Sequence, residues 1–117
     1  MTTFTKNKLS GSTNGRNIKI VATATAGTTI HTGVTGTTDF DEIYIFATNT
    51  DIVTRTLTIE YGGTTAPDDL IEIDLEPQKG AYLVIPGWLL NNATLVRGFA
   101  SAADVVVVNG YINEIRA

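Results

Sequence analysis

The sequence predicts an all-β protein, an antiparallel β-sandwich of the jelly-roll-like or immunoglobulin-like type with about eight strands and an extended N-terminal arm. Threonine accounts for 20 of the 117 residues, and together with valine and isoleucine it makes a chain rich in β-branched side chains, which favour strands. Apolar and polar residues alternate with period two in several segments. Clusters of Gly, Pro, Asn and Asp separate these segments, as turn residues do.

The first half of the chain holds four expected strands. Residues 16–25 (RNIKIVATAT) alternate Ile and Ala on one face with Lys and Thr on the other. Residues 28–34 and the segment DEIYIFATN at 41–49 are rich in β-branched and aromatic side chains. Residues 56–61 (TLTIEY) alternate strictly again, which is typical of a half-buried strand.

The second half is expected to add four more strands. Residues 71–76 (IEIDLE) alternate strictly, while 80–85 (GAYLVI), 94–100 (TLVRGFA) and 104–115 (DVVVVNGYINEI) are largely apolar runs. No segment has a convincing helical period, so helix should be minor. The side chains expected to face inward are those on the apolar side of the alternating runs: Ile18, Ile20, Ile43, Ile45, Leu57, Ile59, Ile71, Ile73, Leu83 and Ile85.

The chain is expected to form one domain at residues 16–117, preceded by an extended arm at residues 1–15. Its length suits a single core. The first fifteen residues are rich in Thr, Ser, Asn, Gly and Lys, a composition typical of a segment that becomes ordered only on binding. The first nineteen residues carry four cations and no acid, whereas the remainder carries four cations against twelve acids. A basic arm therefore precedes an acidic body.

Composition argues against several classes of partner. The net charge of −4 disfavours general binding to nucleic acid or to an anionic membrane surface. No stretch reaches transmembrane length, and the N-terminus lacks the apolar core of a signal peptide, so synthesis in a cytoplasm is expected. The absence of cysteine excludes disulfides and thiolate metal sites.

The row of acids Glu72, Asp74 and Glu76 is expected to form a solvated strand face, because it alternates strictly with apolar residues. Such a row lacks the pocket that a catalytic carboxylate needs. The alternative is a calcium site at Asp68, Asp69 and Glu72, although the spacing is not that of an EF-hand.

Two other features are interpreted as structural. His31 is the only histidine, which excludes a metal site with two histidines in one chain, and we expect it on a strand face. Gly33 and Gly36 are expected to be turn glycines, because no phosphate-loop lysine and no helix pattern follow them. We expect no catalytic residue and no cofactor, because no nucleophile, base and orienting partner stand in a recognisable spacing.

Two apolar segments suggest contact with another subunit. Val105 to Val108 are apolar on both faces of a strand, and the segment VIPGWLLNN at 84–92 places three large apolar residues where a polar surface loop is expected. Both segments could instead plug the open ends of the sandwich. The candidate interface residues are Trp88, Leu89, Leu90, Val106 and Val108.

Four segments together carry a family resemblance: TTDFDEIYIFATNT, TLTIEYGGTTAPDDLIEIDLEP, GAYLVIPGWLLNNATLVRGFAS and VVVVNGYINEI. In this succession the chain resembles the small head decoration, or capsid cement, proteins of tailed bacteriophages, over residues 28 to 116. The match is one of overall pattern and carries no catalytic residue.

The resemblance implies a non-enzymatic virion structural protein, made in the bacterial host cytoplasm and located on the capsid surface. It would bind the major capsid protein, stabilise the mature shell, and form a trimer or dimer. Where such proteins grip the shell with an N-terminal arm, the matching segment is residues 1 to 19, with Lys6, Lys8 and Arg16 as capsid contacts. Two alternatives stay open: a head-tail connector or tail component, and a carbohydrate-binding sandwich displayed on the virion.

Overall fold

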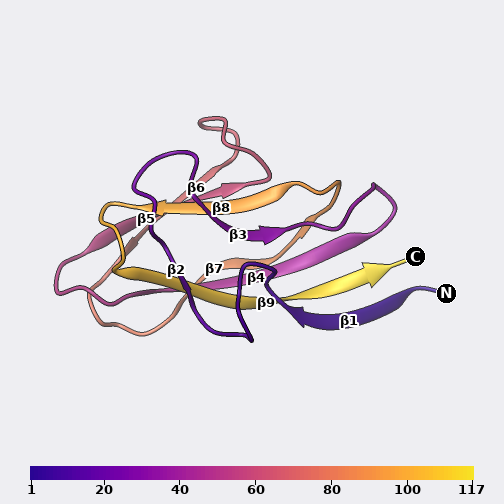
Figure 1. Ribbon diagram of the computed structural model, residues 1–117, viewed down its shortest axis with the longest axis horizontal. Helices are drawn as coiled ribbons and strands as arrows, with labels where there is room; N and C mark the ends of the chain where they lie inside the picture. The colour runs from indigo at the N-terminus through magenta and orange to yellow at the C-terminus, as the bar shows by residue number, and fades with distance from the viewer.

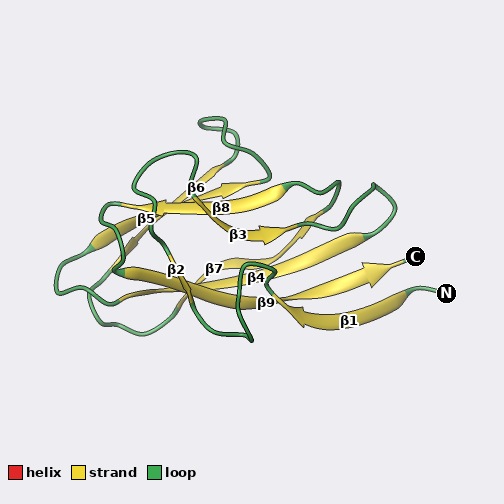
Figure 2. Cartoon of the chain, viewed as in Figure 1, coloured by secondary structure: helices red, strands yellow, loops and turns green.

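A computed structural model describes all 117 residues and shows nine strands and no helix (Figures 1 and 2). Accordingly, no helix long and apolar enough to cross a membrane is present. The strands are β1 (Thr3–Lys8), β2 (Ile18–Lys19), β3 (Thr28–Thr32), β4 (Phe40–Asn49), β5 (Arg55–Tyr61), β6 (Leu70–Leu75), β7 (Tyr82–Leu90), β8 (Leu95–Ala100) and β9 (Val106–Arg116).

The strands form two antiparallel sheets that pack as a sandwich, which confirms the predicted all-β class. Sheet A has the order β1-β9-β4-β7, and the short β2 also pairs with β9. Sheet B has the order β3-β8-β5-β6. Figure 1 shows the two sheets as an upper and a lower layer, with the two chain ends side by side on β1 and β9.

The core lies between the sheets and follows the predicted alternation closely in β4 and β5. Ile43 and Ile45 of β4 face Leu57 and Ile59 of β5 across the core, and all four are fully buried. Ile71 and Ile73 in the edge strand β6 are only partly buried but pack against this core.

The prediction that Leu83 faces inward is wrong, because its side chain is 51% exposed. The register between β4 and β7 shifts at this point: Ile45 pairs with Ile85, but the next residue, Phe46, pairs with Leu83. The extra residue, Val84, forms a β-bulge that reverses the alternation. Leu83 consequently lies on the outer face of sheet A.

Two predicted element boundaries also differ from the structure. Of the strand expected at 16–25, only Ile18–Lys19 pairs with a neighbour. The Ile20 amide still donates to the carbonyl of Val106, but the amides of Val21 and Ala22 donate to the hydroxyl of Thr28 instead of to a strand. The apolar segment at 84–92, expected to be a loop, largely belongs to the second half of β7.

The expected N-terminal arm is not evident. Residues Thr3–Lys8 pair with the C-terminal half of β9 as strand β1, although all six residues are exposed. Leu9 then enters the core and is fully buried. The Gly11 amide donates to the carbonyl of Ile30, where the two backbones approach so closely that a Cβ on Gly11 would lie 2.5 Å from that oxygen. The first fifteen residues are therefore part of the domain.

Candidate functional site

The outer face of sheet A carries several aromatic and aliphatic side chains, with the hydrogen-bonded pair Asn113 and Glu42 between two groups of them. Because Ile43 and Ile45 point inward, the alternate residues of β4 point outward, and the strand register aligns them with outward residues of β7, β9 and β1. Phe4, Leu83 and Leu89 are more than half exposed on this surface. We call it the aromatic face; its members are Phe4, Phe40, Tyr44, Phe46, Leu83, Leu89, Tyr111 and Ile115.

Two tyrosines form the centre of the aromatic face. The rings of Tyr44 and Tyr111 stack with their centroids 4.7 Å apart, and the ammonium of Lys6 lies 4.9 Å from the centroid of Tyr111. Gly87, at a φ of 98°, lies against the Tyr44 ring, where a Cβ would come within 2.9 Å. Desolvation, and secondarily the nearby Glu42 carboxylate, raise the pKa of Tyr44 above its usual value. The ring faces at this centre are thus occupied by neighbouring groups.

Charge is distributed unequally between the two outer faces of the sandwich. Lys6, Lys8 and Lys19 are exposed on the outer side of sheet A, because they pair with outward residues of β9. Glu72 and Asp74 are exposed on the outer side of sheet B. The outer side of sheet A therefore carries three lysines along β1 and β2 and one carboxylate, Glu42, whereas the edge of sheet B is acidic.

The predicted capsid-contact residues occupy two different elements. Lys6 and Lys8 belong to strand β1 beside the aromatic face. Arg16 lies in the connection between β1 and β2, where its side chain is exposed and its amide donates to the carbonyl of Thr13. The structure therefore brings Lys6 and Lys8 together and leaves Arg16 apart from the strand that holds them.

The structure revises the candidate subunit interface. Trp88 and Leu89 are 45% and 51% exposed and are available to a partner. Leu90, Val106 and Val108 are buried in the core of their own domain, so their side chains cannot contact a second subunit. The apolar run on β9 is explained by the two faces of sheet A, one of which closes the core.

A buried polar cluster links the two sheets at the end near the chain termini. Asp41 of β4 accepts a hydrogen bond from His31 of β3 at 2.9 Å and one from the amide of Val34 at 3.1 Å, both at Oδ2. Its Oδ1 lies 3.4 Å from the guanidinium of Arg116. His31 lies on a strand, as predicted; it and Asp41 are each 2% exposed, so the histidine is on the inner face, enclosed between the sheets.

The hydrogen bonds of this cluster join three parts of the chain and leave no group free for catalysis. The amide of Ser10 donates to Nδ1 of His31 at 3.0 Å, which places the ring proton on Nε2, where it is donated to Asp41. Both ring nitrogens are thus occupied, and neither is free to take a proton from a substrate. The cluster ties the residues after β1 to both sheets.

The hydroxyl of Tyr61 is buried close to this cluster and has no hydrogen-bond partner. The ring packs edge-on against Trp88, with centroids 5.6 Å apart. Desolvation, and secondarily the negative charge of Asp41, raise the pKa of Tyr61 well above its usual value. The buried hydroxyl could not be predicted from the alternation, because Tyr61 follows the apolar parity of its strand.

A second buried carboxyl group fixes a loop over sheet B. Glu60 is fully buried, although its position in the alternation places it on the outer face. It accepts hydrogen bonds from the hydroxyl of Thr25 and from the amide of Gly27, and no ion pair includes it. These contacts hold residues 21–27, here called the covering loop, against β5.

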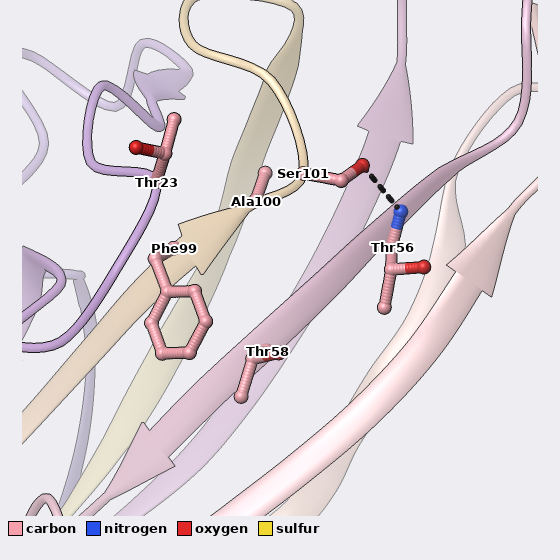
Figure 3. A pocket seen from close by; sticks show the side chains of 6 residues that line it. All are labelled: Thr23, Thr56, Thr58, Phe99, Ala100 and Ser101. Carbon is pink, nitrogen blue, oxygen red and sulfur yellow. Dashed lines mark hydrogen bonds between the residues drawn. The ribbon is translucent and has the colours of Figure 1, made fainter.

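Beside the covering loop lies a small pocket with a volume of about 150 Å³. Figure 3 shows Phe99 between Thr23 of the loop and Thr58 of β5, with Ser101 bonded to the amide of Thr56. The lining consists of these five residues and Ala100. The hydroxyls of Ser101 and Thr56 are engaged with protein groups, the latter with Asp74.

The acidic row behaves as predicted, because Glu72, Asp74 and Glu76 are all exposed. In the calcium alternative, Asp69 uses its Oδ2 to accept the amide of Thr65 within the turn. The structure contains no group of three or more His, Asp or Glu side chains placed to hold a metal ion.

Comparison with protein-family models, with curated proteins and with solved structures gave no match.

Proposed function

We propose that this chain is a non-enzymatic virion structural protein that binds the outer surface of a phage capsid and stabilises the mature shell. The observation that carries the proposal is the aromatic face, an exposed apolar surface bordered by Lys6 and Lys8 on a protein that already has a complete core. Exposed apolar side chains bordered by polar groups in this way are typical of a protein-binding site. The sequence resemblance to decoration proteins supplies the class of partner, the major capsid protein.

The aromatic face has the composition that such contact requires. Tyrosine and phenylalanine provide large contact areas with few rotatable bonds, and apolar area removed from water contributes about 25 cal/mol per Å². The lysines favour an acidic surface on the shell. A protein that binds the mature lattice better than its precursor shifts the equilibrium toward the mature form by mass action.

The two tyrosines at the centre of the aromatic face favour a protein partner over a glycan. A sugar platform needs aromatic ring faces open to solvent. Tyr111 is covered by Lys6 on one side and stacked on Tyr44, whose ring also meets Gly87. Location on the particle distinguishes a connector or tail protein from a decoration protein. Cryo-electron microscopy of purified particles would show a connector or tail protein at a vertex or in the tail, and a decoration protein over the whole shell.

The proposal is tested by mixing the protein with undecorated mature capsids and measuring occupancy. The double variant Leu83→Ser/Leu89→Ser removes two exposed apolar side chains from the aromatic face, and we expect it to lose binding. The matched control is Ile52→Ser/Val53→Ser, which removes two exposed apolar side chains from the β4–β5 connection. Full occupancy by the first variant would refute the proposal.

These substitutions test binding more specifically than a deletion of the N-terminus would. Removal of residues 2–15 would take away strand β1 and the fully buried Leu9, so lost binding could reflect a damaged fold. The two leucines are exposed on β7, and their replacement leaves the core unchanged.

A further inference from the structure

The sandwich has four edge strands, and their protection is unequal. Sheet A ends in β1 and β7, and sheet B ends in β3 and β6. An edge strand exposes a row of unpaired amide and carbonyl groups, which can pair with another chain unless the edge is blocked.

Two of the four edges are blocked within the chain. Strand β7 contains Pro86 and two register shifts against β4, and both devices prevent regular pairing. The free side of β3 is already used, because the Ile30 carbonyl accepts the amide of Gly11 and the Thr32 amide donates to the hydroxyl of Ser10.

The two remaining edges carry opposite charges. Strand β1 is regular over six residues and presents Lys6 and Lys8 on one face. Strand β6 is regular over six residues and presents Glu72 and Asp74 on one face. All four charged side chains are exposed. Pairing of β1 with β1, or of β6 with β6, would place like charges together, which is unfavourable across strands.

We propose that β1 of one copy of this chain pairs antiparallel with β6 of a second copy, with Lys6 opposite Asp74 and Lys8 opposite Glu72. The alternation places these four side chains on the same side of the joined sheet. One carboxylate oxygen of Asp74 already accepts the Thr56 hydroxyl, which orients the group on the strand surface.

The arrangement predicts the type of assembly. β1 and β6 lie on opposite sides of the sandwich, β1 at the lower right and β6 at the top of Figure 1. The contact uses two different surfaces and is therefore heterologous, so it produces a closed ring or an open chain. A symmetric pair of identical edges is disfavoured wherever it brings the like charges opposite one another. This interface goes beyond the proposed function, because it involves only copies of this chain and does not depend on a shell.

The first test reverses the charges and measures association by sedimentation. We expect Lys6→Glu/Lys8→Glu, and separately Glu72→Lys/Asp74→Lys, to weaken self-association by about tenfold or more, because each change creates two like-charge pairs. The chain with all four changes should regain the wild-type association. The control Arg16→Glu/Lys19→Glu makes the same change in net charge outside β1 and should have little effect.

The second test uses the absence of cysteine in the chain. A Lys6→Cys protein mixed with an Asp74→Cys protein under mild oxidation should form the mixed disulfide faster than either protein forms its own dimer. Circular dichroism of each variant confirms that it is folded. A wild-type monomer at high concentration without mixed cross-linking, or association unaffected by both reversals, would overturn the proposal.

Discussion

Replacing Asp41 by alanine tests whether the buried polar cluster holds the two sheets together. Its Oδ2 accepts hydrogen bonds from His31 and from the Val34 amide, at 2.9 Å and 3.1 Å. Alanine leaves the buried His31 donor and the half-buried Val34 amide without an acceptor, and a buried donor in this state costs about 1 to 3 kcal/mol. The guanidinium of Arg116 loses one of its two carboxylate partners but keeps Glu114 and is partly solvated, so this contact adds little. We expect Asp41→Ala to lower the free energy of unfolding by about 3 to 5 kcal/mol.

The matched control is Asp41→Asn. The amide oxygen can take the place of Oδ2 and keep both short hydrogen bonds, so only the 3.4 Å contact with Arg116 is lost. The expected cost is about 1 kcal/mol. Equilibrium unfolding in urea measures both values, provided that the dependence on denaturant is unchanged between variants. If alanine costs less than about 1 kcal/mol, or as little as asparagine, the cluster does not link the sheets.

Three further substitutions test other features of the structure. Tyr61→Phe removes a buried hydroxyl without a partner, so it should be neutral or stabilising in urea unfolding. Because the pKa of Tyr61 is raised on folding, wild-type stability is complete below the ordinary value of 10.0 and falls as pH rises above it, and Tyr61→Phe should lose less stability there. Glu60→Ala should release the covering loop, increasing its cleavage in limited proteolysis, whereas Glu60→Gln should protect it; equal cleavage would contradict this role. Gly87→Ala should lower the melting temperature more than Gly80→Ala, because both glycines have positive φ but only Gly87 lies against the Tyr44 ring. Equal decreases would show that the Tyr44 ring moves aside for the added methyl group.

The fold class and most of the core follow from the sequence because alternation reports which side of a strand is apolar. In β4 and β5 this parity holds without interruption, and Ile43, Ile45, Leu57 and Ile59 are buried as expected. Leu83 shows where the reasoning fails, because a single bulged residue reverses the parity of everything beyond it. Neither bulge can be predicted from the neighbouring residues in the sequence, because each depends on how β7 pairs with β4.

Strand β1 could not be recognised for a different reason. All six of its residues are exposed, so TFTKNK carries no apolar side and resembles a flexible segment. Its order comes from the ladder of backbone hydrogen bonds with β9, more than a hundred residues along the chain. The burial of Glu60 could not be predicted either. The alternation correctly places Glu60 on the outer side of β5, but the covering loop encloses its side chain there.

The interaction surfaces raise a related problem, since the side chains that suit a protein interface are those that suit a core. On β9 the apolar residues alternate between the two faces of sheet A, so Val106 and Val108 belong to the core while Tyr111 belongs to the aromatic face. Core and surface residues of such a strand can be told apart by counting in steps of two from a residue known to point inward. Identifying that residue requires the strand register. Charge is more informative in β1 and β6, where the lysines and the acids all lie on an outer side. The opposite charges of the N-terminal residues and the acidic row were visible in the sequence, and the structure places Lys6, Lys8, Glu72 and Asp74 on the two edges that contain no proline and no register shift.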